Sequence, residues 1–441
     1  MKSRRLVPMY VIAPFFFFGI IIAVPADAAD SLSLNEAVRI AVQNGPTVRQ
    51  AIAGVHASEA RAEESRTFEY PSANAGAGYT RIGPVPELFF PGLGSFKLFP
   101  ENNYDAHVSL RQTLYDFGKV SATADVSESR VQTTRRTVDM AKLSLAYQTA
   151  QIFHTILFLQ LSIDVQDEEI QTLNEHLLIN RKREEAGTAT DFDVLTTEVR
   201  VAGAENQRIE LRNNLQKQRI LLRRLLGLDP SSEVALRGTF AVSAAVFNAD
   251  SLIALALNQR VEYAALQDEA RTASLRVRLA SLGDYPSMNF MVEWGVKNGF
   301  IPNLDILRGN WVAGFQVEVP LYEAGRTEQK KEEATADVEG INANLADMKD
   351  RIGSEVRQAL SDVQAAVGKF ETSELQVHQA KEAVSIARKR YEAGAISNLD
   401  LLDAETSLSQ ANLSRVQVLY SYVLSRLYLD HSIGTRIWEA H

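Results

Sequence analysis

The most extended pattern of hydrophobic residues in the chain repeats every seven positions. Between Gly118 and Gly187 it includes five apolar residues at this spacing: Val131, Val138, Leu145, Ile152 and Leu159. A sustained seven-residue period is typical of long helices that pack as coiled coils. At ~1.5 Å per residue, the stretch between the two glycines forms a helix on the order of 100 Å long. Such a helix is longer than a compact domain needs.

The chain contains this arrangement twice. Residues 183–198 read REEAGTATDFDVLTTE, and residues 390–405 read RYEAGAISNLDLLDAE. LYDFGK at 114–119 likewise matches LYEAGR at 321–326. Each copy is therefore expected to contain a long helix, a tight turn at its glycine, and a shorter returning helix.

The repeat defines the predicted organisation of the chain. Each copy begins with a further helix, expected at about 33–70 in the first and 250–285 in the second. The predicted segments are a first repeat at 29–228, a connecting segment at 229–249, a second repeat at 250–435 and a C-terminal tail at 436–441.

Four segments change from the helical period to a period of two. They are residues 72–80, 105–115, 287–296 and 311–321. Segments of about ten residues with one apolar and one polar face are typical of a transmembrane β-barrel, although amphipathic hairpins of soluble proteins alternate in the same way. The membrane interpretation is favoured because these segments lie at the ends of very long helices. Four strands are too few to close a barrel, and open edges are not tolerated in lipid, so several copies of the chain must assemble. Three copies would supply twelve strands.

The N-terminus is predicted to be a signal peptide, residues 1–28. Basic residues precede an apolar run at 11–24, and Ala26-Asp27-Ala28 fits a cleavage site. A retained N-terminal anchor is the alternative. The chain has no cysteine, so neither disulfides nor a lipidated cysteine is expected.

Composition narrows the function classes. The formal net charge of −9 argues against nucleic acid as a partner. The seven histidines are scattered without a metal-ligand spacing, and no phosphate-loop, nucleophile-elbow or zinc-protease motif is present. An enzyme is therefore not expected, and neither is a cofactor or a bound metal.

The tandem repeat, the Tyr-x-x-Gly-(Lys/Arg) at 115–119 and 322–326, and the Gly-x5-Asp-(Val/Leu)-Leu of the two turns together resemble the TolC-like outer-membrane efflux factors. The resemblance implies an α+β membrane protein whose homotrimer forms a 12-stranded β-barrel in outer-membrane lipid, continuous with a periplasmic α-barrel. It also implies a periplasmic adaptor and an inner-membrane pump as partners.

The resemblance assigns roles to the two turns. Asp400 and Asp403 match the family's aspartates at the narrowest point of the periplasmic aperture, and Tyr391 and Asp193 match members of its closing hydrogen-bond network. Helix capping and solvation are the alternative roles for these acids. The hairpin tips that would contact the adaptor contain Gly187, Thr188, Gly394 and Ala395. The chain departs from some relatives at Ile396, where they have a gating arginine, so its closed state is expected to be held differently.

The leading functional prediction is a passive outer-membrane exit duct for an efflux or secretion system. A trimeric structural or adhesive stalk without transport is the alternative. The polar faces of the strands, which carry Arg111, Asn289, Glu293 and Glu318, favour a water-filled lumen.

Overall fold

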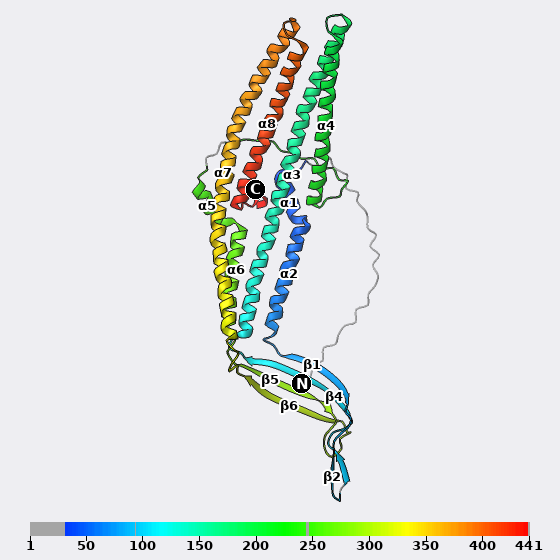
Figure 1. Cartoon of the computed structure of the whole chain (residues 1–441), viewed down its shortest axis with the longest axis vertical. Helices are drawn as coiled ribbons and strands as arrows, with labels where there is room; N and C mark the ends of the chain where they lie inside the picture. Colours follow the sequence, from blue (N-terminus) through cyan, green and yellow to red (C-terminus); the bar gives the residue numbers. More distant parts are fainter. Residues whose placement is uncertain (1–30, 93, 244–246, 440–441) are drawn as a thin grey trace, which may run out of the picture.

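The computed structural model describes residues 31–92, 94–243 and 247–439. The predicted signal peptide, residues 1–28, lies outside them. The described chain is an elongated helical body with a small antiparallel sheet at one end (Figure 1). This confirms the predicted protomer of long helices and a few strands.

Two helices of 67 residues each, α3 (Lys119–Glu185) and α7 (Arg326–Glu392), run the length of the body. Each is on the order of 100 Å long. The returning helices α4 (Asp191–Leu226) and α8 (Asn398–Ile433) accompany the halves of α3 and α7 that lie farther from the sheet (Figure 1). Two antiparallel hairpins, α3–α4 and α7–α8, therefore project away from the sheet.

The halves of α3 and α7 nearer the sheet are accompanied by α2 (Pro46–Thr67) and α6 (Val261–Ser281) (Figure 1). The prediction of one continuous helix at 33–70 is wrong. Pro46 has no N–H to continue the ladder of α1 (Leu34–Asn44), and it begins a new helix after Gly45.

The predicted helix at 250–285 is also interrupted, between α5 (Ala249–Gln259) and α6. Arg260 at the break is extended, with φ −67° and ψ 118°. Its guanidinium pairs with Glu355 of α7 and lies 3.5 Å from Glu262. The break is thus stabilised in part by Glu355, a residue that a local helical pattern does not include.

The sheet has the strand order β1-β4-β5-β6, and every neighbouring pair is antiparallel. Its strands are β1 (Ser72–Arg81), β4 (Asn102–Tyr115), β5 (Ser287–Lys297) and β6 (Arg308–Glu318). The register pairs Ala75 with Val108, Val108 with Trp294, and Trp294 with Trp311. Because paired residues point to the same side of a sheet, the predicted apolar faces of the four strands form one continuous surface.

The segment between β1 and β4 contains a further hairpin, which projects beyond the sheet (Figure 1). It consists of β2 (Glu87–Phe90) and β3 (Gly94–Lys97). The last predicted strand ends at Glu318 rather than Leu321, since Pro320 cannot donate a ladder hydrogen bond.

The helical core lies where the short helices meet the long ones. Phe153 and Ile156 of α3 pack with Leu222 and Leu226 of α4, and each of these side chains is at most 1% exposed. A second cluster joins α5, α7 and α8 around Ile352. Among the described residues, no helix is both long enough and apolar enough to cross a membrane.

Candidate functional site at the hairpin tips

The two tips lie at the end of the body farthest from the sheet (Figure 1). At the first tip Gly187 has φ +72°, and at the second Gly394 has φ +70°. This is the left-handed backbone conformation, which residues other than glycine rarely adopt. The Thr188 amide donates to the Arg183 carbonyl over 2.7 Å, and the Ala395 amide donates to the Arg390 carbonyl over 2.8 Å. These bonds close the last turns of α3 and α7 and fix both tips in the same geometry.

Asp193 and Asp400 each complete a capping box at the start of a returning helix. The Asp193 carboxylate accepts from the amide and hydroxyl of Thr190 over 3.0 and 2.6 Å. The Asp400 carboxylate accepts from the amide and hydroxyl of Ser397 over 2.9 and 2.7 Å. The bonds from Ser397 lower the pKa of Asp400. Both acids therefore cap the N-terminus of a helix, which is the alternative role given for them in the sequence analysis.

Asp403 lies one turn beyond Asp400 and is exposed. Its carboxylate is 3.0 Å from the guanidinium of Arg200 on α4, so the pair connects the second hairpin to the first. The side chains remain 40% and 60% exposed, for Arg200 and Asp403 respectively. An exposed pair of this kind contributes about 0–1 kcal/mol, which is too little to hold the hairpins together alone.

A buried polar network connects the hairpins more firmly. The Tyr391 hydroxyl on α7 donates to Asn180 Oδ1 on α3 over 2.7 Å. Asn180 Nδ2 donates to Thr197 Oγ1 on α4 over 3.0 Å and to Asn398 Oδ1 on α8 over 2.9 Å. Asn180 and Thr197 are 0% exposed, and Asn398 is 5% exposed. All four hairpin helices therefore meet at one set of hydrogen bonds.

His176 extends this network by one turn of α3. Its Nε2 lies 2.6 Å from Asn398 Oδ1, and because that oxygen can only accept, Nε2 carries the proton. Asn398 Nδ2 donates to the backbone carbonyl of Asp193 over 3.2 Å. The guanidinium of Arg183 covers the Tyr391 ring at 4.5 Å from its centroid. The network is thus enclosed, and each of its side-chain amide and hydroxyl groups has a hydrogen-bond partner.

The structure brings some of the predicted aperture residues together and separates others. Tyr391 lies inside the network, whereas Asp193 joins it only through its carbonyl. Asp400 and Asp403 lie outside it, and Ile396 is half-buried in the turn. Sequence reasoning missed His176, Asn180, Thr197 and Asn398.

One pattern could have identified Asn180. The seven-residue series of α3 continues beyond Leu159 through Gln166, Leu173 and Asn180, and both amides are 0% exposed. A polar residue at a core position of a coiled coil is often retained for specificity of packing rather than for stability.

The rest of the tip region has no grouping that suggests a bound metal. Within residues 31–92, 94–243 and 247–439, no set of three or more His, Cys, Asp or Glu side chains is placed to hold an ion.

Comparison with known proteins identifies relatives over nearly the whole chain. The family model described as "Outer membrane efflux protein" matches residues 37–228 and 252–435. The chain is 23% identical over 440 residues to the outer membrane protein TolC of Vibrio cholerae, covering 98% of this chain and 96% of the relative. It is 26% identical over 427 residues to the alkaline protease secretion protein AprF of Pseudomonas aeruginosa, covering 92% and 85%.

Solved structures have the same fold. The CmeC outer membrane channel of Campylobacter jejuni matches with a TM-score of 0.77 at 17% identity, over 91% of this chain and 85% of the channel. The outer membrane protein VceC of Vibrio cholerae matches with a TM-score of 0.74 at 21% identity, over 91% and 96%.

Proposed function

The chain belongs to the outer membrane efflux protein family, and we propose that it is the outer-membrane exit duct of a tripartite efflux or secretion system. The duct is passive, and a periplasmic adaptor and an inner-membrane pump supply the substrate and the energy. One observation carries this proposal. A sheet with one exposed apolar face lies at the end of helices far longer than a compact domain requires.

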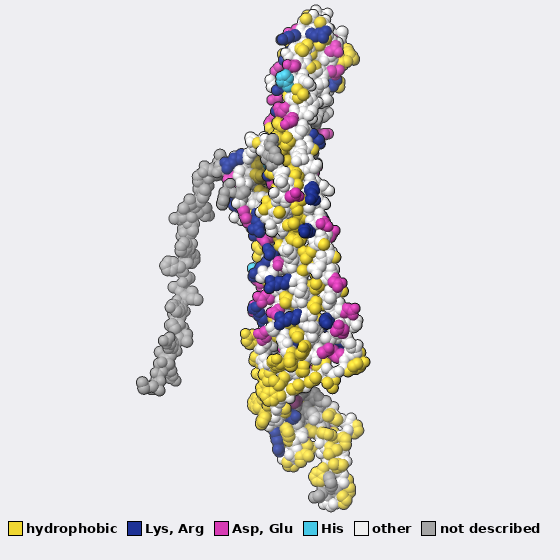
Figure 2. Space-filling view, turned by 90° about the vertical axis from the view of Figure 1, so that its left-hand side faces the viewer, with side chains coloured by type: hydrophobic (Ala, Val, Ile, Leu, Met, Phe, Trp, Pro, Cys, Tyr) yellow, Lys and Arg dark blue, Asp and Glu magenta, His cyan; other side chains and the backbone are white. Residues whose placement is uncertain are grey.

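The apolar face is large and composed of side chains suited to lipid. Trp294 is 63% exposed, Trp311 73%, Phe315 70% and Val317 61%. Apolar side chains gather at the sheet end of the molecule, whereas charged side chains are spread over the helices (Figure 2). Exposed aromatic and aliphatic surface of this extent marks an interaction surface or a membrane contact.

The other face of the sheet is polar. Thr113 donates to Asn289 across β4 and β5 over 3.0 Å, and Ser109 is paired in register with Glu293. A strand that is apolar outside and polar inside is suited to lipid on one face and a water-filled lumen on the other. This arrangement favours a conducting duct over a packed stalk.

We propose that three copies form the barrel. Among the described strands, β1 and β6 each have one edge without a partner. An unpaired strand edge in lipid costs several kcal/mol for each unsatisfied group, so the edges must pair with other copies. Three sheets of four strands close a barrel of twelve.

We also propose that the tips form the periplasmic aperture, with Asp193, Tyr391, Asp400 and Asp403 at or beside its narrowest point. The buried network around Asn180 joins the two hairpins of each copy and takes the place of a gating arginine at Ile396. Opening the aperture separates the hairpins and breaks these bonds.

The tips are also the proposed site of adaptor contact. Gly187, Thr188, Gly394 and Ala395 form the turns, and apolar side chains lie exposed immediately beyond them. Phe192 is 69% exposed and Leu399 is 51% exposed, at matching positions of the two repeats. Exposed apolar side chains at the far end of a long hairpin suit a partner with a complementary apolar groove.

Conductance tests this function directly. The purified protein, reconstituted in a planar lipid bilayer, is expected to form trimeric channels that pass ions. A trimer that inserts into the bilayer but does not conduct would instead support the structural stalk.

A further inference from the structure

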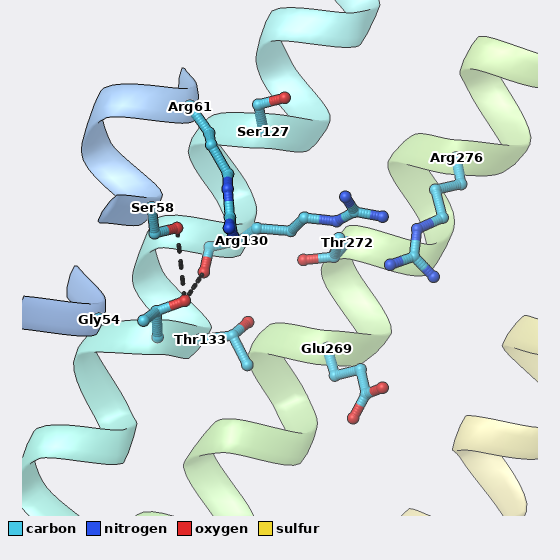
Figure 3. A pocket seen from close by; sticks show the side chains of 10 residues that line it. Gly54, Ser58, Arg61, Ser127, Arg130, Thr133, Glu269, Thr272 and Arg276 are labelled. Atoms are coloured by element: carbon cyan, nitrogen blue, oxygen red, sulfur yellow. Dashed lines mark hydrogen bonds between the residues drawn. The ribbon is translucent and has the colours of Figure 1, made fainter. Parts of the chain in front are cut away.

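A group of arginines without carboxylate partners lies between α2, α3 and α6. They line a cavity of about 360 Å³ together with hydroxyl groups, among them those of Thr133 and Thr272. We name this feature the arginine groove and define it by Arg61 of α2, Arg130 of α3 and Arg276 of α6. Figure 3 shows Arg130 and Arg276 extending from α3 and α6 toward the same gap, with the Thr272 hydroxyl beside it.

Several arginines on these three helices are paired. Neighbouring side chains form ion pairs between helices: Arg135 with Glu59 at 2.8 Å, Arg136 with Asp268 at 2.9 Å, and Arg278 with Asp125 at 3.7 Å. The three arginines of the groove have no such partner among the residues that the structure describes. One carboxylate, that of Glu269, lines the cavity. The groove thus concentrates positive charge in a chain whose net charge is −9.

Arg276 provides a second, independent observation. Its Nε is shielded from solvent and has no hydrogen-bond partner within the described part of the chain. A charged group is costly to leave without acceptors, and an anion in the cavity would supply acceptors to the other N–H groups of this guanidinium. Three guanidinium groups in one cavity also repel one another, and an anion would relieve this repulsion.

We propose that the arginine groove binds a small multivalent oxyanion of the phosphate or carboxylate class. The planar guanidinium groups match the oxygen geometry of such an anion, and the Thr133 hydroxyl supplies a further donor. This site is separate from the proposed aperture, since it lies near the sheet, whereas the aperture lies at the tips.

The anion can come from solution or from a lipid headgroup, and position favours solution. The groove arginines lie about 8–17 Å along the helices from their sheet ends, at ~1.5 Å per residue. If the sheet spans the membrane, as proposed above, these distances reach or exceed the thickness of the headgroup layer, which is about 5–8 Å.

Calorimetric titration of the detergent-solubilised trimer with sodium pyrophosphate tests the proposal. The wild type is expected to bind, and the affinity should fall as salt is added, since screening weakens charge contacts. The variant R130Q/R276Q should bind at least tenfold more weakly for each arginine removed, because hydrogen bonds to charged groups contribute roughly tenfold or more. E269Q should bind more tightly, since the one carboxylate in the cavity loses its charge.

R278Q is the matched control. It removes an arginine of the same helix whose partner is Asp125, outside the groove, and it should leave pyrophosphate binding unchanged. Equal binding by the wild type and R130Q/R276Q, or no binding by the wild type, would overturn the proposal. The wild type could also fail to bind pyrophosphate while R130Q/R276Q fails to form a trimer. That pair of results would show that carboxylates of a second copy fill the groove.

Nanodiscs distinguish the two sources of the anion. The affinity for pyrophosphate should be the same in phosphatidylethanolamine discs with and without phosphatidylglycerol. Loss of binding only when phosphatidylglycerol is present would identify a lipid headgroup as the occupant and would overturn the assignment to a soluble anion.

Discussion

Tyr391 and Asn180 lie 211 positions apart in the chain, yet the hydroxyl of one donates to the side-chain oxygen of the other over 2.7 Å. The bond joins α7 to α3 and therefore joins the second hairpin to the first. Asn180 is 0% exposed, so its oxygen has no access to water when the bond is lost. This makes Tyr391 a sensitive position at which to test the proposed aperture.

Replacing Tyr391 with Phe should loosen the two hairpins. The change removes the hydroxyl but keeps the ring, leaving a buried acceptor unsatisfied at a cost of about 1–3 kcal/mol. We expect a higher open probability in planar-bilayer recordings and a lower melting temperature. Tyr428→Phe, at an exposed ring on α8, is the control and should change neither. If gating is unaltered in Tyr391→Phe, this bond has no part in the gating mechanism.

A buried histidine should make stability depend on pH. Burial lowers the pKa of His154 to about 4 from the ordinary 6.5. Between these values the unfolded chain binds a proton that the folded chain does not, so stability is lost as pH falls from about 6.5 toward 4. At 1.36 kcal/mol per pKa unit, the loss approaches about 3 kcal/mol per chain.

The measurement compares wild type and His154→Leu by denaturant unfolding in detergent at several pH values. Other groups titrate in both proteins, so the informative quantity is the difference in unfolding free energy between them. As pH falls below 6.5, the unfolding free energy of His154→Leu should rise relative to that of the wild type. The difference should level off near pH 4. A constant difference across this range would show that His154 is solvated in the folded protein.

Some of these features could be predicted from sequence because their physical cause is local. The alternation of apolar and polar residues along β5 and β6 indicates which face of each strand is apolar. Gly187 and Gly394 mark turns that need a positive φ. The break at Arg260 could not be predicted from the local pattern, because the side chain that stabilises it, Glu355, is on a distant helix.

The hydrogen-bond network shows the same limit at the candidate site. Asn180 interrupts an apolar series and so indicates that some partner exists, but it does not identify Asn398 as that partner. The local sequence pattern alone could not separate the role of Asp193 from that of Asp400 either. Both carboxylates cap helices in the same way, and only the folded chain places the Asp193 carbonyl against Asn398.

Adjacent residues of β6 should respond oppositely to a charge. Phe315 lies on the apolar face, 70% exposed and 5.1 Å between ring centroids from Phe290, whereas Gln316 is on the other face, paired with Asn289. Phe315→Arg should cost about 2–4 kcal/mol per chain if that face contacts lipid, and Gln316→Arg should be tolerated. The amount of folded trimer in outer-membrane fractions measures the effect. Equal assembly of both variants would contradict a lipid-facing surface.

The adaptor should bind at the tips, and the absence of native cysteine makes this simple to test. Single cysteines at Thr188 or Ala395 should form crosslinks to the adaptor in cells. Cysteines at Phe89 and Leu98, in and beside the β2–β3 hairpin at the opposite end, are controls and should not. Crosslinks from the control positions alone would place the adaptor at the wrong end of the molecule for a tripartite duct.

The last prediction concerns the charge of the aperture. In a trimer, Asp400 and Asp403 supply six carboxylates near the proposed constriction, and like charges a few ångströms apart repel by about 1 kcal/mol or more per pair. The wild-type channel should therefore select cations and be blocked by divalent or trivalent cations from the periplasmic side. Asp400→Asn/Asp403→Asn should lose the block and weaken the selectivity. Asparagine retains an oxygen to accept from Ser397, so the start of α8 is preserved. Asp347→Asn, an exposed acid on α7 far from the tips, should retain the block. If the double variant is blocked as strongly as the wild type, the constriction lies elsewhere and these two acids act only in capping α8 and in pairing with Arg200.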